Sequence, residues 1–251
     1  MQQKFYPMCK IYRNCRVHFR KHCSPYSGFN NSKICMKPNF LILCAGKSER
    51  FGFPKPLLVI RGKTLLQFQI QKIQEAGYNK ITVVVGYHKE KILQELKKLP
   101  VQISINFHAE RGMFSSIQTG LRSINNSINK NLPVFIQPID CLVPCSETLH
   151  KLECNLEQVD AVMPEYKSKS GHPLLISFNV QKEIIKSQTN YRLDMLLREK
   201  FFNKVKKVNV NDSCVISNIN YLQDLERWKW KISHEVHEVF TTETQRHREH
   251  F

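Results

Sequence analysis

Residues Phe40 to Leu58 read FLILCAGKSERFGFPKPLL, an apolar run that breaks into glycine and charge and then becomes apolar again. The part from Phe40 to Cys44 has the length and the apolar character of a buried strand. The part from Ala45 to Gly52 contains too much glycine and charge to continue that strand. The sequence therefore predicts a loop at the carboxyl end of a buried strand.

The composition of this loop suits a phosphate group. Ala45 and Gly46 leave the backbone uncovered, so successive N–H groups can approach an anion. Ser48, Arg50 and Lys55 add a hydroxyl and two cations. The spacing fits neither the P-loop pattern nor the glycine pattern of dinucleotide-binding folds. We interpret the loop as a phosphate cradle of another kind; the alternative is an ordinary strand-to-helix connection with surface cations.

The length of 251 residues allows one large domain or two small ones. The sequence has no apolar run of about 18 residues, so no membrane span is expected. It also lacks the uninterrupted apolar segment and cleavage site of a secretory signal, and we expect a cytoplasmic protein. Nine cysteines without a C-x-x-C pair predict reduced thiols and no disulfide framework.

The net charge of +17 is unevenly distributed. Eight of the positive charges lie in residues 1–38, which contain no Asp or Glu. We expect residues 1–35 to be a disordered basic extension; a chain start at Met36 and a basic nucleic-acid-binding arm are the alternatives. Residues 232–251 contain few core-forming side chains and are expected to be a disordered tail. One compact domain is predicted for residues 36–231, and nucleic acid is not its expected partner.

Strand-like and helix-like segments alternate after Phe40. Thr64 to Ala76 has the apolar periodicity of a helix, and the β-branched run Ile81 to Val85 predicts a buried parallel strand. A second amphipathic helix is predicted for Lys89 to Leu99 and a more exposed strand for Val101 to Phe107. This order predicts a doubly wound α/β fold with a mostly parallel sheet.

The second half of the chain offers a carboxylate at a strand end. Pro133 to Ile139 is predicted as a strand, and Asp140 follows it. A carboxylate near the carboxyl ends of such strands is suited to hold a hard cation against phosphate oxygens. Alternatively, Asp140 caps the helix expected near Ser146. Short strands are predicted at Val208 to Val210 and at Val215–Ile216.

The glycine loop and its flanks resemble the signature L-x-A-G-x-S-x-R-F-G-x-P-K-x-L-L of the MobA-like nucleotidyltransferases. The matching residues here are Leu43, Ala45, Gly46, Ser48, Arg50, Phe51, Gly52, Pro54, Lys55, Leu57 and Leu58. In that family the loop wraps the triphosphate of a nucleotide, so the resemblance implies that Arg50 and Lys55 offset the phosphate charge. The residues implied to contact the nucleotide are Leu43, Ala45, Gly46 and Ser48. The implied fold is Rossmann-like, of the GT-A-like type, with three αβα layers.

A second segment, Gly112 to Leu121, resembles the family element G-M-x-x-S-[LI]-x-x-G-[LI], which lies over the nucleobase. The resemblance implies that Ser116 and Gly120, four residues apart on one helical face, contact the base. From the residues alone, Ser115 and Ser116 are expected to cap the turn and to point their hydroxyls outward. An ordinary capped helix explains the apolar residues of this segment equally well.

The resemblance assigns a magnesium ligand to Asp140, although family members usually have proline or glutamine-proline directly after this aspartate and here Cys141 follows. A later N-x-N element matches Asn218 and Asn220. Because Leu222 replaces a proline that would fix the next helix start, we favour Asn218 as the second metal ligand over Asn220; a turn-forming role is the alternative for Asn218.

The element Gly171-His172-Pro173 resembles G-H-P-[VL]-L-[IF], which is more typical of the molybdopterin cytidylyltransferase branch, and it implies that His172 lies on the acceptor side. We therefore expect a Mg²⁺-dependent nucleotidyltransferase that uses CTP or GTP, releases pyrophosphate and has molybdopterin as its first-choice acceptor. A sugar 1-phosphate or another phosphorylated alcohol is the alternative acceptor. A nucleotide-binding regulatory module without turnover is an alternative of a different class.

Overall fold

The computed structural model describes residues 37–60, 62–126, 131–221 and 223–224, apart from the side chain of Arg50. The expected basic extension (1–35) and the expected tail (232–251) lie outside these ranges. In the described part of the chain, no helix has the length and apolar character needed to cross a membrane.

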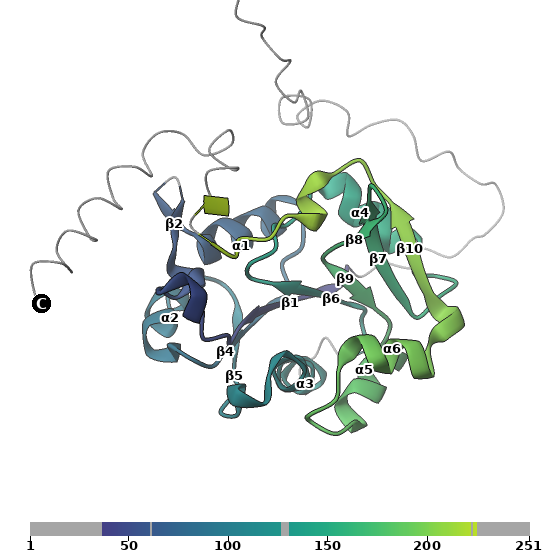
Figure 1. Ribbon diagram of the computed structural model, residues 1–251, viewed down its shortest axis with the longest axis horizontal. Coiled ribbons are helices and arrows are strands. Elements are labelled where there is room, and N and C mark those ends of the chain that lie inside the picture. The colour runs from purple at the N-terminus through teal and green to yellow at the C-terminus, as the bar shows by residue number, and fades with distance from the viewer. Residues whose placement is uncertain (1–36, 61, 127–130, 222, 225–251) are drawn as a thin grey trace, which may run out of the picture. The chain divides into compact units, whose positions relative to one another are not determined.

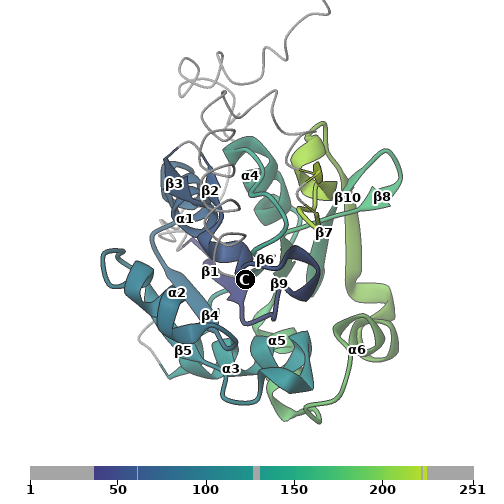
Figure 2. The same cartoon turned by 60° about the vertical axis from the view of Figure 1, so that its left-hand side comes forward.

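The main sheet contains eight strands in the described part of the chain. They are β1 (Asn39–Cys44), β4 (Ile81–Val85), β5 (Gln102–Ile105), β6 (Val134–Pro138), β7 (Ala161–Tyr166), β8 (Lys169–Ser170), β9 (Leu174–Ile176) and β10 (Val205–Asn209). Their order is β10-β7-β9-β6-β1-β4-β5, with β8 paired to β7. Figure 2 shows β5 and β10 at opposite edges. The strands β8 and β9 pair antiparallel with their neighbours, and the other pairs are parallel.

The predicted strand at the start of the glycine loop lies at the centre of this sheet. All six residues of β1 are buried, and β1 pairs in parallel with β4 on one side and with β6 on the other. A strand covered on both faces reads as a continuous apolar run, which explains the sequence up to Cys44. A separate hairpin of β2 (Val59–Ile60) and β3 (Lys63–Thr64) follows the loop.

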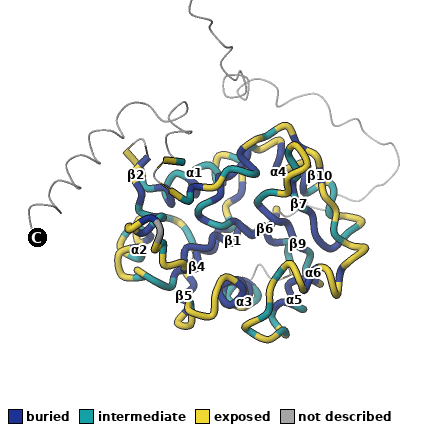
Figure 3. The backbone as a smooth tube through the Cα atoms, in the orientation of Figure 1, coloured by how far each residue is buried: buried dark blue, intermediate teal, exposed yellow. Residues whose placement is uncertain are grey.

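Helices cover both faces of the sheet. They are α1 (Leu65–Glu75), α2 (Lys89–Leu96), α3 (Met113–Asn125), α4 (Ser146–Cys154), α5 (Phe178–Lys186) and α6 (Leu193–Lys200). One apolar cluster joins the sheet to α1, α2 and α4, and a second joins it to α3, α5 and α6. Figure 1 shows α1 and α4 on one side of the sheet and α3, α5 and α6 on the other, and Figure 3 shows the central strands buried between them. The three-layer α/β fold is therefore confirmed.

Helix α1 illustrates how far local sequence determines the fold. Its N-cap is Thr64, whose hydroxyl accepts from the backbone N–H of Gln67 while the Gln67 side chain accepts from the N–H of Thr64. This capping box satisfies two donors at the helix start. The predicted core residues Leu66, Ile70 and Ile73 are buried, so the helix is confirmed to within one residue at each end.

One predicted element is wrong. Val215–Ile216 is not a strand but the end of a 3₁₀ helix, Ser213–Ile216. The Asp212 carboxylate accepts a hydrogen bond of 2.9 Å from the N–H of Cys214 and so caps this turn. It also accepts one of 2.8 Å from the N–H of Cys145 at the start of α4. The cap outweighs the strand preference of the two β-branched residues.

Candidate active site

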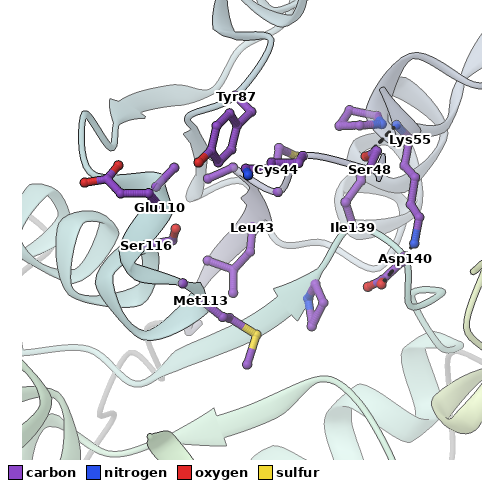
Figure 4. A pocket seen from close by; sticks show the side chains of 17 residues that line it. Leu43, Cys44, Ser48, Lys55, Tyr87, Glu110, Met113, Ser116, Ile139 and Asp140 are labelled. Atoms are coloured by element: carbon purple, nitrogen blue, oxygen red, sulfur yellow. Dashed lines mark hydrogen bonds and ion pairs between the residues drawn. The ribbon is translucent and has the colours of Figure 1, made fainter. Parts of the chain in front are cut away.

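A pocket of about 370 Å³ lies at the carboxyl ends of β1, β4 and β6 (Figure 4). Its lining residues come from the glycine loop, the connection after β4, the start of α3 and the turn after β6. They are Leu43 to Ser48, Lys55, Pro56, Tyr87, Ala109, Glu110, Gly112, Met113, Ser116 and Pro138 to Asp140. Parallel α/β sheets bind ligands at this end of their strands.

The glycine loop forms one wall of the pocket. Leu43, Ala45, Gly46 and Ser48, the residues expected to contact the nucleotide, all line it. A Cβ placed on Gly46 would meet nothing within 4 Å, so the backbone at this position is open on the pocket side. The Ser48 hydroxyl accepts a hydrogen bond of 3.2 Å from the N–H of Lys55, which folds the loop back on itself.

Lys55 lies between two oxygen atoms from distant parts of the chain. Its ammonium nitrogen is 3.4 Å from Asp140 Oδ2 and 3.4 Å from Asn220 Oδ1. Its side chain is 13% exposed, so the charges interact with less screening than a pair on the open surface. The short 3₁₀ helix Lys55–Leu57 begins after Pro54, and this start fixes the backbone of Lys55.

The turn that carries Asp140 is paired with the segment near the end of the domain. The carbonyl of Asp140 accepts from the N–H of Ile219 at 2.7 Å, and that of Ser217 accepts from the N–H of Leu142 at 3.3 Å. The carboxylate of Asp224 accepts from the N–H of Asn220 at 2.8 Å. The first two bonds pair the turn with this segment across a large separation in sequence, and the third fixes the backbone at Asn220.

The structure places the two candidate asparagines differently from the sequence-based preference. Asn218 forms an antiparallel bridge with Cys141, and its Oδ1 is 3.2 Å from the Cys141 sulfur, which donates to it. Asn220, not Asn218, contacts the ammonium of Lys55, which also contacts Asp140. The thiol at position 141, where family members usually have proline, engages the amide that the sequence assigns to the metal.

The two serines of α3 do not cap the helix, contrary to expectation. Gly112 is the N-cap, and no side-chain cap is present there. Ser115 and Ser116 are each 4% exposed, and each hydroxyl accepts a hydrogen bond of 3.0 Å from the amide of Asn106. Ser116 still lines the pocket, although its hydroxyl points into the protein rather than outward.

Gly120 lies away from the pocket. A Cβ at this position would be 2.3 Å from a methyl carbon of Leu41 and 2.7 Å from one of Val84. The glycine therefore lets α3 pack closely on β1 and β4, and this contact accounts for the small residue that the sequence assigns to the nucleobase. Small residues four positions apart on a helix allow close packing on a sheet as well as close contact with a nucleobase.

His172 lies in the turn before β9 and does not line the pocket. Its N–H donates to the carbonyl of Val215 at 2.7 Å, and a Cβ on Gly171 would be 2.1 Å from that same oxygen, so only glycine fits. Burial lowers the pKa of His172, while the charge of Asp140 acts in the opposite direction. The imidazole is therefore neutral at pH 7.

Two buried cysteines, Cys44 and Cys141, are close enough to Asp140 to be affected by its charge. Burial, with a smaller effect from the charge of Asp140, raises the pKa of the thiols of Cys44 and Cys141 well above the ordinary value. Thiols react and bind metals as thiolates. This site therefore offers carboxylate and amide oxygens, rather than sulfur, to a cation.

The sequence model of the family described as "MobA-like NTP transferase domain" matches residues 40–207. This chain belongs to that family. The match runs from the first residues of β1 into β10, and it includes the glycine loop, α3 and Asp140. Residues 40–207 thus form a domain of the MobA-like NTP transferase family.

Several curated proteins are similar to this MobA-like domain. "Bifunctional protein GlmU" of Methanococcus maripaludis is 45% identical over 65 residues, which are 24% of this chain and only 16% of that protein. "Molybdenum cofactor guanylyltransferase" of Campylobacter jejuni is 26% identical over 200 residues, covering 77% of this chain and 96% of that protein. The second likeness is weaker per residue but extends along the whole relative.

A crystal structure of Rv0371c from Mycobacterium tuberculosis in complex with manganese shares the fold. The TM-score is 0.62 at 18% identity, and the alignment covers 76% of this chain and 97% of that one.

The sequence does not single out two further pocket residues of the MobA-like domain, Tyr87 and Glu110. Figure 4 shows them at the end of the pocket away from Lys55. The ammonium of Lys47 lies 5.2 Å from the centre of the Tyr87 ring. Hydrogen bonds from its own backbone and from His108 lower the pKa of Glu110, which keeps it ionised. Tyr87 follows the carboxyl end of β4, and that position is a signal by which the sequence could have identified it.

Proposed function

We propose that this MobA-like domain transfers a nucleoside monophosphate from an NTP to a phosphorylated acceptor and releases pyrophosphate. The observation that carries the proposal is the meeting of Lys55, Asp140 and Asn220 directly beside the open backbone of the glycine loop. A cation-binding carboxylate and a fixed ammonium next to a phosphate cradle are the parts that phosphoryl transfer requires.

The nucleotide lies with its triphosphate along Gly46 and Ser48 and with its base toward Tyr87 and Glu110. Ser116 lies at that base end, and the Glu110 carboxylate offers an acceptor to the amino group of cytosine or guanine (Figure 4). Arg50 remains the proposed second cation for the triphosphate. Gly120 has no place in this arrangement, because it packs on the sheet.

In the reaction, an oxygen of the acceptor phosphate forms a bond to the α-phosphorus, and the bond from that phosphorus to the bridging oxygen breaks. Pyrophosphate leaves with the bonding electron pair. Lys55 neutralises the charge that develops on the phosphate oxygens, while the loop holds the chain of phosphates in line. No protein nucleophile takes part, which agrees with the protonated state of the buried thiols.

Asp140 and Asn220 fit a Mg²⁺ site by the chemistry of their donors. Carboxylate and amide oxygens are ligands that Mg²⁺ accepts, and here the ammonium of Lys55 lies between them as a cation does. No group of three His, Cys, Asp or Glu side chains in the described residues could hold a metal alone. Asp140 and Asn220 would therefore bind the ion weakly by themselves, and phosphate oxygens of the nucleotide would complete its coordination. The ion would supply positive charge at the α-phosphate.

Molybdopterin is the first-choice acceptor, with CTP or GTP as the nucleotide. The likeness to a molybdenum cofactor guanylyltransferase over almost its full length supports this choice. The resemblance of the Gly171-His172-Pro173 element to that of the molybdopterin cytidylyltransferase branch supports it as well. A sugar 1-phosphate is the second candidate.

The test is a pyrophosphate-release screen of the four ribonucleoside triphosphates against molybdopterin and a panel of sugar 1-phosphates. The Asp140→Ala variant serves as the blank. Release with molybdopterin and CTP or GTP supports the proposal. Release with a sugar 1-phosphate alone assigns the second acceptor, and tight nucleotide binding without release for any acceptor would show a binding module instead of an enzyme.

A further inference from the structure

Two completely buried glutamines converge on the turn that carries Asp140. Gln69 lies on α1 and Gln137 on β6, and both side chains are 0% exposed. The Gln69 amide donates to the carbonyls of Ile139 and Cys141, each at 2.7 Å. Helix α1 is thus joined to the carbonyls of the two residues that flank Asp140.

The second glutamine holds the same turn from the sheet. The Gln137 amide donates to the carbonyl of Cys141 at 2.6 Å and to that of Pro138 at 3.1 Å. The Cys141 carbonyl therefore accepts from two buried amides at once. The carbonyl of Asp140 itself accepts from the N–H of Ile219. Hydrogen bonds from three separate elements fix consecutive carbonyls of this turn.

We propose that Gln69 and Gln137 are positioning residues that aim the Asp140 carboxylate at the cation site. β6 ends at Pro138. Beyond it the backbone makes isolated bonds to neighbouring segments, among them the N–H of Ile139 to the Leu43 carbonyl and the Cys141–Asn218 bridge, and the glutamine amides add their bonds to these. Groups that orient a metal ligand affect metal affinity strongly even though they do not touch the metal. The inference rests on the proposed function, because it assigns these glutamines to the metal ligand of that reaction.

The chain offers a matched control at the other end of the same strand. Gln181 on α5 is also 0% exposed, and its amide donates to the carbonyl of Leu132 at 2.8 Å. Leu132 precedes β6, whereas the Asp140 turn follows it. The Oε1 atoms of Gln69, Gln137 and Gln181 are alike as well, since none has a hydrogen-bond partner among the described residues. A general cost of losing a buried amide should therefore appear in Gln181 variants too.

The experiment compares Gln69→Met, Gln137→Met and Gln181→Met in the full chain. Methionine keeps the length of the side chain and removes the donors. Mn²⁺ alone is titrated against each protein, the free ion is followed by its EPR signal, and the Asp140→Asn variant defines binding that does not involve the site. Thermal unfolding, the Mg²⁺ dependence of pyrophosphate release and the KM for NTP are measured on the same samples.

We expect Gln69→Met to weaken the Asp140-dependent binding of Mn²⁺ by about tenfold to a hundredfold, with a matching rise in the Mg²⁺ needed for turnover. The KM for NTP at saturating Mg²⁺ should stay within about twofold, because the phosphate loop keeps its contacts. Gln181→Met should lower the melting temperature by a similar amount but leave Mn²⁺ binding unchanged. Should Gln69→Met fail to fold, Gln137→Met tests the same carbonyl from the sheet.

Three results would overturn the inference. Mn²⁺ binding by Gln69→Met and Gln137→Met equal to that of the wild type would show that the glutamines only stabilise the fold. Equal weakening in Gln181→Met would show a non-specific effect. Absence of Asp140-dependent Mn²⁺ binding in the wild type would remove the metal site itself. Mn²⁺ binding that depends on Gln69 in a protein that releases no pyrophosphate would support the positioning role and contradict the proposed function.

Discussion

The two sides of the pocket are built in different ways. The phosphate loop, residues 44–55, is one continuous segment. A hydrogen bond of 3.2 Å within the loop, from the N–H of Lys55 to the Ser48 hydroxyl, holds its backbone. The acidic side combines the turn at Asp140 with the segment at Asn220, and hydrogen bonds between distant residues hold the two together. The loop side of the site is therefore local in sequence, whereas the acidic side is assembled by the fold.

The two sides also differ in what they offer to a ligand. The loop presents open backbone at Gly46 and a hydroxyl at Ser48, whereas the acidic side presents side-chain oxygens of Asp140 and Asn220. Lys55 belongs to the loop in sequence and reaches the acidic side in space. Substitutions on the two sides should therefore separate nucleotide binding from metal binding.

The largest effect is expected from Asp140→Asn on the acidic side. Loss of the carboxylate removes the main charge that holds the metal, so pyrophosphate release should fall by about three orders of magnitude or more. The melting temperature should change little, because asparagine keeps the size of the side chain and an oxygen that can accept from the Lys55 ammonium. Turnover rates and thermal unfolding check both statements. A Mg²⁺ titration curve like that of the wild type would place the metal elsewhere.

Lys55→Met tests the residue that connects the two sides. Turnover should fall by about two to three orders of magnitude, as for the loss of one group that stabilises transition-state charge. Binding of Mn²⁺ without nucleotide should instead become tighter, because the ammonium between Asp140 and Asn220 no longer competes for these oxygens. Kinetics and Mn²⁺ titration measure the two effects. Near-normal turnover would exclude Lys55 from the site.

The two asparagines divide the acidic side further. Asn220→Ala should reduce turnover and metal affinity by about tenfold, since Asn220 Oδ1 faces the cation site. Asn218→Ala should change both by about twofold or less, since its oxygen accepts from the Cys141 thiol instead. Steady-state kinetics over a range of Mg²⁺ concentrations compares them. The reverse order would restore the preference for Asn218.

Two glycines contrast the phosphate loop with the helix beside it. Gly120→Ala should lower the free energy of unfolding by about 1–3 kcal/mol, because the added methyl group overlaps Leu41 and Val84. Gly46→Ala should leave stability nearly unchanged, because its Cβ position is open, yet it should raise the KM for NTP by about tenfold by keeping the phosphates from the backbone. Chemical denaturation and steady-state kinetics on both variants provide the measurements. If Gly120→Ala raised the KM for NTP and left the free energy of unfolding unchanged, Gly120 would belong to the nucleobase site.

The smallest effect concerns His172. Burial lowers the pKa of its imidazole below that in the unfolded chain, so the unfolded state binds the proton first as the pH falls. Stability should therefore be full above the ordinary histidine value of about 6.5 and decline as the pH falls below it. Melting temperatures of the wild type and His172→Gln at neutral and mildly acidic pH check this. If the His172→Gln variant lost stability at acidic pH as steeply as the wild type does, groups other than His172 would cause that loss.

Local patterns were sufficient for most of the fold. The buried run of β1 and the capped, periodic segment of α1 each follow from interactions within a few residues, and both are confirmed. The wrong prediction at Val215–Ile216 arose where a side chain outside the segment, Asp212, supplied a cap that strand preference does not register.

The site divides in the same manner. The loop residues that line the pocket could be predicted because glycine, a hydroxyl and cations directly follow a buried strand and because the segment resembles the MobA-like signature. The sequence could not predict which of Asn218 and Asn220 faces the cation site. That choice depends on which amide accepts from the Cys141 thiol once two distant segments have paired. Gly120 shows a third case, in which one spacing of small residues serves either packing or recognition.

We propose that this pocket cleaves an NTP at its α-phosphorus and transfers the nucleoside monophosphate to a phosphorylated acceptor. The most direct measurement follows CTP or GTP labelled either at the α- or at the γ-phosphate, incubated with molybdopterin and Mg²⁺. We expect the α-label to appear in the acceptor and the γ-label in pyrophosphate, and we expect Asp140→Asn to abolish both the labelling of the acceptor and the release of pyrophosphate. Release of the γ-label as inorganic phosphate, or an α-label that never leaves the nucleotide, would contradict it.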